Sequence, residues 1–162
     1  MEMIIKKMET PAEFEGKGYV HWKALREAYA GMLDQEYLDR QTMEKCVKMA
    51  YQWPDNVLVA KDGDKVIGFT GYGACRDEDL PGTGEVIALY VLSEYYGKQV
   101  GHALMQAALE KLSGYGKIVL WVLEGNDRAI RFYEKCGFRF DGTEKPIKLG
   151  KEVTERRMVL TR

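Results

Sequence analysis

The chain has 162 residues, of which 46% are hydrophobic and 30% charged; this suits one globular domain over residues 1–162 and leaves no room for two catalytic domains. Its 24 Lys and Arg and 25 Asp and Glu give a net charge of −1, and no segment is basic enough to predict a nucleic-acid partner. The longest wholly apolar run, Val86 to Leu92, is far shorter than the roughly 18 residues of a membrane span. Since the first residues show no secretory pattern, we expect a cytoplasmic protein without a membrane partner.

The first third of the chain predicts one strand and two helices. Met3 to Met8 has the pattern of a short strand. From about Gly18 to Leu33, apolar side chains recur every three or four residues, as in a helix that buries one face. A second helix is predicted from Asp34, a typical N-cap residue, to a stop before Pro54.

Three strands are predicted next. Asn56 to Lys61 and Lys65 to Cys75 are rich in β-branched and aromatic residues, and Asp62-Gly63-Asp64 joins them, so they should form an antiparallel hairpin. Arg76 to Gly84 is a turn-rich acidic loop. The following strand, Glu85 to Leu92, is apolar on both faces, which predicts a central place in the sheet.

The rest of the chain alternates helices and strands. Lys98 to Ser113 carries one apolar stripe and predicts a helix, Lys117 to Leu123 predicts a buried strand, and Asn126 caps a helix that reaches Lys135. Phe138 to Thr143 and Val153 to Leu160 complete the set. The order predicts an α/β fold with about seven strands and four helices, in which the fourth and fifth strands run parallel across a helix.

The cysteines and histidines of the sequence predict neither a metal site nor a serine catalytic triad. Cys46, Cys75 and Cys136 are far apart, with no Cys-x-x-Cys pair and no histidine nearby, so we expect reduced, mostly buried thiols and no metal. The only histidines are His21 and His102, and no Gly-x-Ser-x-Gly segment offers a nucleophilic serine to either.

The junction between the fourth strand and the next helix predicts a phosphate site. There a buried strand ends, a loop with Gly97 turns, and a helix begins. Such a junction directs unpaired backbone N–H groups and the positive end of a helix dipole at one point, which suits a pyrophosphate. Other phosphate motifs fail, because Gly63 to Thr70 has Phe69 in place of the Walker lysine and Gly71-Tyr72-Gly73 lacks the third dinucleotide-motif glycine at Arg76.

Two segments together resemble the GNAT N-acetyltransferase superfamily. Tyr96 to Gly101 is similar to its acetyl-CoA loop, Gln/Arg-x-x-Gly-x-Gly/Ala, although Tyr96 stands in place of Gln or Arg and Gln99 in place of Gly. Asn126 to Phe138 resembles the second signature of the family, in which Asn and Ala lead to an aromatic or aliphatic residue with Tyr, and then to Gly-Phe. The resemblance implies a mixed, mostly antiparallel sheet whose parallel fourth and fifth strands splay apart.

The resemblance implies acetyl-CoA as co-substrate and no metal. Backbone groups of Leu89, Tyr90 and Val91 are then expected to pair with the pantetheine arm, as an added strand would. Asn126 matches a residue that touches the pantetheine or the acetyl end, but it fits a plain helix cap equally well. His102 either contacts phosphate or is a solvated surface residue. The implied pyrophosphate loop consists of Gly97, Lys98, Gln99, Val100, Gly101 and His102.

Candidate acid and base groups also follow from the resemblance. Tyr133 matches a tyrosine that protonates the departing thiolate, and the alternative is a buried aromatic residue. Glu85 stands where some members carry a glutamate that works through water, and the alternative is a capping carboxylate. Period-two alternation predicts that Glu85 shares a face with Leu89 and Val91. Trp121 occupies the position of the base of other members and cannot accept a proton.

The expected activity is transfer of an acetyl group from acetyl-CoA to a primary amine of a small molecule or a protein, by direct attack in a ternary complex. The alternative is a non-catalytic acyl-CoA-binding or sensor module. The acidic run Asp77, Glu78 and Asp79 could attract a cationic amine, or be only a solvated loop. Relatives in the superfamily imply a possible homodimer.

Overall fold

The computed structural model describes residues 1–162 and contains seven strands and five α-helices. In chain order the elements are β1 (Met3–Lys7), α1 (Pro11–Tyr29), α2 (Gln35–Arg40), α3 (Met43–Gln52), β2 (Val57–Asp62), β3 (Lys65–Ala74), β4 (Gly84–Val91), a 3-10 turn (Ser93–Tyr95), α4 (Val100–Lys111), β5 (Lys117–Leu123), α5 (Asp127–Lys135), β6 (Arg139–Leu149) and β7 (Lys151–Thr161). No helix combines the length and the apolar character needed to cross a membrane.

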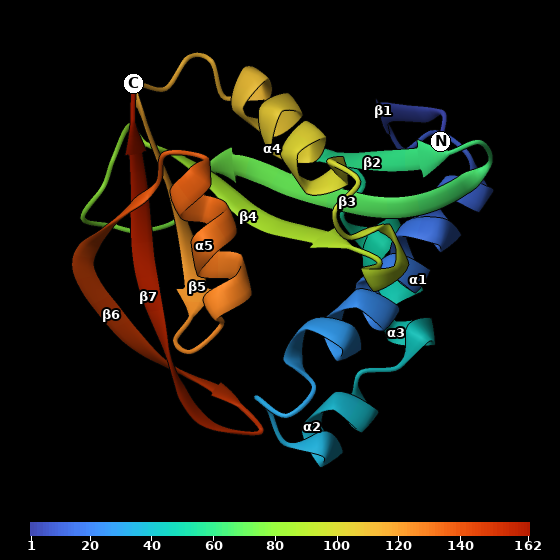
Figure 1. Ribbon diagram of the computed structural model, residues 1–162, viewed down its shortest axis with the longest axis horizontal. Coiled ribbons are helices and arrows are strands. Elements are labelled where there is room, and N and C mark those ends of the chain that lie inside the picture. The colour runs from blue at the N-terminus through green and yellow to red at the C-terminus, as the bar shows by residue number, and fades with distance from the viewer.

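All seven strands form one sheet in the order β1-β2-β3-β4-β5-β7-β6. Every neighbouring pair is antiparallel except β4 and β5, which are parallel and pair only at Gly84–Ile118 and Glu85–Val119. Beyond these two positions the strands diverge, and in Figure 1 β5, β7 and β6 stand at a steep angle to β2, β3 and β4. The predicted α/β sheet with splayed parallel fourth and fifth strands is confirmed.

The first helix begins earlier than its apolar stripe suggested, at Pro11 instead of Gly18. Thr10 and Glu13 form a capping box, in which the Glu13 amide donates to the Thr10 side chain and the Thr10 amide donates to the Glu13 carboxylate. The Thr-Pro-x-Glu pattern was visible in the sequence, and its capping chemistry explains the added turns.

The single helix expected between Asp34 and Pro54 is two helices, α2 and α3. The break falls at Thr42, whose hydroxyl accepts a hydrogen bond from the Lys45 amide at 3.1 Å and starts a new helix. The prediction of four helices was therefore wrong by one. The last two strands are also longer than expected, with 11 residues each, and meet at Gly150.

A β-bulge at Ile87 interrupts the alternation of β4. Gly71 of β3 pairs with Ala88 and the next residue, Tyr72, pairs with Val86, so Ile87 is an extra residue. Val86 and Leu89 consequently pack on the same side, against the core under α4 and α5. Glu85 therefore does not share the face of Leu89, and the prediction from period-two alternation was wrong.

The core lies on both faces of the sheet. On one face, α4 and α5 cover an apolar cluster that includes Leu120, Val122 and Met158. On the other face, α1 covers a second cluster around Val59 and Phe69. Between these two clusters, a cleft opens in the gap between β4 and β5.

Candidate active site

A cleft of about 840 Å³ opens where β4 and β5 separate. Side chains and backbone from α1, β4, the loop before α4, β5 and α5 line it. Of the predicted site residues, Glu85 and Lys98 are outside the lining. The others all line this cleft: Leu89, Tyr90, Val91, Gly97, Gln99, Val100, Gly101, His102, Asn126 and Tyr133.

The loop before α4 presents a series of free backbone donors to the cleft. The amides of residues 97–102 donate no hydrogen bond within the protein, as expected for residues that precede and open a helix. Gly97 and Gln99 both have positive φ, 76° and 67°. Gln99 thus adopts the left-handed conformation that a glycine takes easily, at a cost of about 1 kcal/mol.

Glu27 of α1 holds the start of this loop in place. Its carboxylate accepts hydrogen bonds from the Ser93 amide, at 2.9 Å, and from the Ser93 hydroxyl. Glu27 also lines the cleft. No pattern in the sequence predicts this role of Glu27, because a contact between residues 66 positions apart leaves no local signal.

Tyr133 projects from α5 into the cleft and packs edge-on against Phe132 and Phe138. Burial raises the pKa of its phenol well above the usual 10, and neighbouring Tyr29 adds to this effect. The phenol is therefore fully protonated at neutral pH. Burial also raises the pKa of Tyr29 and of Tyr90, which line the same cleft.

Asn126 and His102 occupy different environments in the cleft. The Asn126 side chain accepts a hydrogen bond from the Ala129 amide at 3.4 Å, so it caps α5 and lines the cleft at once. His102 is exposed in the first turn of α4. No group of three or more His, Cys, Asp or Glu side chains is placed to hold a metal ion.

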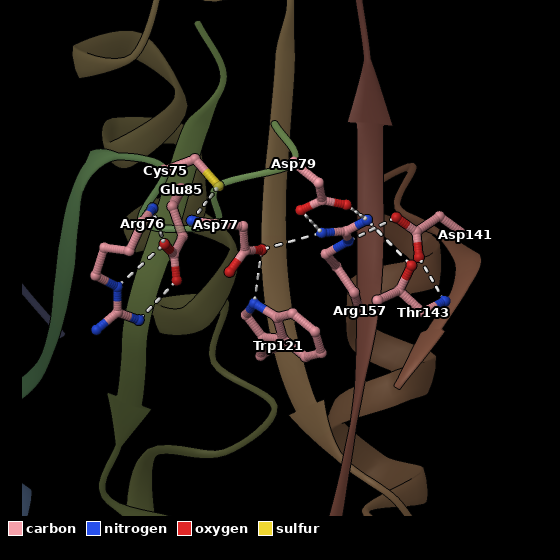
Figure 2. A network of polar contacts seen from close by, with 9 residues as sticks. All are labelled: Cys75, Arg76, Asp77, Asp79, Glu85, Trp121, Asp141, Thr143 and Arg157. Carbon is pink, nitrogen blue, oxygen red and sulfur yellow. Dashed lines mark hydrogen bonds and ion pairs between the residues drawn. The ribbon is translucent and has the colours of Figure 1, made fainter. Parts of the chain in front are cut away.

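Glu85 lies at the closed end of the cleft, where β4 and β5 are still paired. Only 1% of the residue is exposed. Its carboxylate accepts hydrogen bonds from the Arg76 backbone amide at 3.2 Å and from the Arg76 guanidinium at 3.2 and 2.7 Å. This ion pair is drawn in Figure 2.

The acidic loop between β3 and β4 binds an arginine of β7. Asp77 and Asp79 accept hydrogen bonds from Arg157 at distances between 2.9 and 3.2 Å, and Asp141 of β6 accepts another at 2.6 Å. In Figure 2, dashed lines join the Asp77 carboxylate to both Arg157 and the indole of Trp121. From the sequence, this acidic loop was expected either to attract a cationic amine or to be only solvated. Neither interpretation included the contact with Arg157.

The sequence matches the acetyltransferase (GNAT) family model over residues 20–138. The chain belongs to this family. Transfer of an acetyl group from acetyl-CoA to an amine is the family's reaction. The matched region contains β4, the loop before α4, β5 and α5, which line the cleft together with α1.

Named relatives agree with this assignment. A probable N-acetyltransferase of Mycobacterium tuberculosis is 30% identical over 148 residues, which cover 85% of this chain and 82% of that protein. N-alpha-acetyltransferase 30 of Schizosaccharomyces pombe is 34% identical over 93 residues, which cover 54% of this chain and 60% of that protein. The match thus spans less than two thirds of the latter relative.

A solved structure shows the same fold. The PaiA N-acetyltransferase of Thermoplasma acidophilum, in complex with coenzyme A, superposes with a TM-score of 0.76, and each chain is covered completely. The two sequences are 23% identical, so the likeness establishes the architecture.

Proposed function

We propose that this chain transfers the acetyl group of acetyl-CoA to a primary amine of a small molecule or a protein, by direct attack in a ternary complex. One observation carries the proposal: a single cleft is lined by residues 97 and 99–102, whose amides are free, and by Tyr133, whose phenol is protonated. The amides suit a pyrophosphate, and the phenol suits a departing thiolate that needs a proton.

The proposed position of the cofactor follows the direction of β4. The pyrophosphate lies on the amides of residues 97–102. The pantetheine arm pairs with the backbone of Leu89 to Val91, where β5 has left β4 without a partner. Residues of this segment line the cleft together with Tyr133, so the thioester comes to lie beside the phenol.

In the proposed reaction, the lone pair of the amine attacks the thioester carbon and forms the new C–N bond. The C–S bond then breaks, and Tyr133 donates its proton to the sulfur. The amine must lose a proton, and we propose that Glu85 receives it through water. Both oxygens of Glu85 are bound by Arg76, so that water has to share the carboxylate with the guanidinium.

We further propose a cytoplasmic location, supported by the three free cysteines, since cysteines remain reduced in that compartment. A homodimer, and the absence of metal, nucleic-acid and membrane partners, stay predictions. The proposed acceptor is an amine of a small molecule or of a protein. One relative is named an N-alpha-acetyltransferase, and another is named an N-acetyltransferase without a stated acceptor.

The experiment is a transfer assay with acetyl-CoA carrying a labelled acetyl group. The acceptors are peptides with a free N-terminus, a lysine side-chain peptide and small diamines, and mass spectrometry locates the label. We expect label on a nitrogen of at least one acceptor. Tyr133→Phe and Glu85→Gln should each lower turnover by roughly 10²-fold or more without weakening coenzyme A binding.

Two outcomes contradict the proposal. Thiol release without any amine, or a labelled cysteine on the protein, would exclude direct attack. Binding of acetyl-CoA and of coenzyme A with equal affinity and no transfer to any acceptor would instead identify a non-catalytic binding module.

A further inference from the structure

Trp121 lies at the point where the cleft begins. It is two residues beyond Val119, the last residue of β5 that pairs with β4. Its neighbours Leu120 and Val122 face the core under α4 and α5, so the indole faces the opposite side of the sheet, together with its cross-strand partner Arg157. Trp121 and the bulged residue Ile87 both line the cleft.

Hydrogen bonds and charges fix the indole in one orientation. Its Nε1–H donates to Asp77 at 3.0 Å, and the same carboxylate oxygen accepts from Arg157 at 3.2 Å. The Lys145 ammonium lies 4.0 Å from the centre of the indole. Rotation of the ring would leave its N–H unpaired and break the hydrogen bond to Asp77, which is drawn in Figure 2.

Arg157 holds Asp77 in place and is itself fixed, because all three nitrogens of its guanidinium donate hydrogen bonds. The arginine is 4% exposed. Besides Asp77 it donates to Asp79 at 2.9 Å, to Asp141 at 2.6 Å and to Thr143 at 3.1 Å. Trp121 is therefore a rigid wall of the cleft and not a side chain that swings aside.

The direction of β4 tells which part of a bound cofactor meets this wall. The strand runs from the closed end of the cleft, at Glu85, to its open end, at Val91. A cofactor with its pyrophosphate on residues 97–102 and its arm along Leu89 to Val91 points its acyl end toward the closed end. Trp121 and Ile87 line the cleft next to that end, each two residues beyond the last paired position of its strand. This step rests on the proposed function.

We propose that Trp121, held by Asp77, limits the length of the acyl group that the cleft accepts. An acetyl group ends before the indole, whereas a longer acyl chain meets it. Because the wall is fixed, the added methylenes find no room and cause strain or expulsion of the chain.

The test measures dissociation constants by isothermal titration calorimetry for coenzyme A, acetyl-CoA and butyryl-CoA. In the wild-type protein we expect butyryl-CoA to bind at least about tenfold more weakly than acetyl-CoA, the size of effect that a misfitting methylene causes. In Trp121→Ala the two affinities should become equal within about threefold. Coenzyme A, which has no acyl group, should bind both proteins alike, and this also shows that the variant is folded.

Two further variants test the role of the hydrogen bond. Asp77→Ala should lose most of the discrimination, whereas Asp77→Asn, which still offers an oxygen to the indole, should keep it. Trp53→Ala is the matched control, because Trp53 is 69% exposed and does not line the cleft; it should discriminate like the wild type. If Trp121→Ala does not fold, Trp121→Phe should show a smaller decrease in the same ratio.

The outcomes separate this inference from the proposed function. Wild-type protein that binds acetyl-CoA and butyryl-CoA equally, or a Trp121→Ala variant that still discriminates tenfold, overturns the inference and leaves acetyl transfer intact. Wild-type protein that binds none of the three ligands overturns the proposed function and this inference with it.

Discussion

At the scale of single residues, buried charges in this protein are stabilised by specific partners. Glu13 is 3% exposed. Burial alone would raise the pKa of its carboxyl, but hydrogen bonds from Lys6, Lys61 and the amides of Glu9 and Thr10 outweigh burial and lower the pKa to about 2. The folded state therefore holds the charged form more strongly than the unfolded chain does.

This shift predicts how Glu13 contributes to acid stability. The folded pKa lies below the unfolded value of about 4.5, so the stabilisation is complete above pH 4.5 and is lost as the pH falls toward 2. Glu13→Gln should lower the free energy of unfolding at pH 7 by on the order of 2 kcal/mol and flatten its pH dependence below pH 4.5. Urea denaturation at several pH values measures both effects.

Glu15→Gln is the control for this prediction, because Glu15 lies on the same helix but is exposed. It should leave the free energy of unfolding at pH 7 nearly unchanged. An equal acid dependence in the wild type and in Glu13→Gln would show that the hydrogen bonds to Glu13 do not stabilise its charge.

Which residues could be predicted from the sequence depended on how local their patterns are. Tyr133, Asn126 and the loop of residues 97–102 belong to short motifs, and the structure brings them to one cleft. Arg157 and Glu27 gave no signal, because their partners are distant along the chain: Asp77 is 80 positions from Arg157. Long-range pairs of side chains leave no periodicity and no spacing to recognise.

At the scale of elements, the junction between β4 and α4 depends on backbone conformation. Gly97 has φ 76° and nothing within 4 Å of the place where a Cβ would stand, so a side chain there is opposed by backbone strain alone. Gly63, in the turn between β2 and β3, has φ 59° and equally open space. The two glycines form a matched pair, of which only Gly97 lines the cleft.

Alanine at these two positions should separate stability from binding. Gly97→Ala and Gly63→Ala should each lower the free energy of unfolding by about 1 kcal/mol. Only Gly97→Ala should weaken coenzyme A binding, by roughly tenfold, because it displaces the amides of the loop. Calorimetric titration tests this, and equal affinities in both variants would show that the loop conformation does not matter for the cofactor.

The elements themselves were predicted well where periodicity is long and poorly where local chemistry interrupts it. β5 has the predicted bounds, Lys117–Leu123. The break before α3 depends on one threonine cap, and the bulge at Ile87 depends on pairing with β3. Pairing between strands is a tertiary property, so alternation along β4 alone could not show that Glu85 faces away from Leu89.

At the scale of the whole molecule, the sheet consists of two halves that are joined by short strand pairing, in addition to the apolar cluster that α4 and α5 cover. One half is β1 to β4 and the other is β5, β7 and β6, and only two residue pairs link β4 to β5. The loop before β4 supplies a second link, through Asp77 and Asp79 to Arg157. A third is the apolar cluster of Leu33, Leu38 and Leu123 between α1, α2 and β5.

Arg157→Ala should therefore be strongly destabilising. The substitution leaves Asp77, Asp79 and Asp141 close together without their cation, which should lower the free energy of unfolding by about 3 kcal/mol. Arg156→Ala is the control, because Arg156 is more exposed and has a loose ion pair of 3.7 Å with Glu144 and a cation–π contact of 3.8 Å with the Phe140 ring, so its loss should cost only about 1 kcal/mol. Equal urea midpoints for the two variants would contradict the role of Arg157 as a link.

The proposed function requires that the unpaired amides of residues 97–102 hold the phosphates of acetyl-CoA. Hydrogen exchange of these amides, followed with and without saturating coenzyme A, tests it most directly. We predict that coenzyme A slows exchange at residues 97–102 and along Leu89 to Val91, and that pantetheine, which has no phosphate, leaves residues 97–102 unchanged. Exchange at residues 97–102 that stays equally fast with saturating coenzyme A would contradict the account.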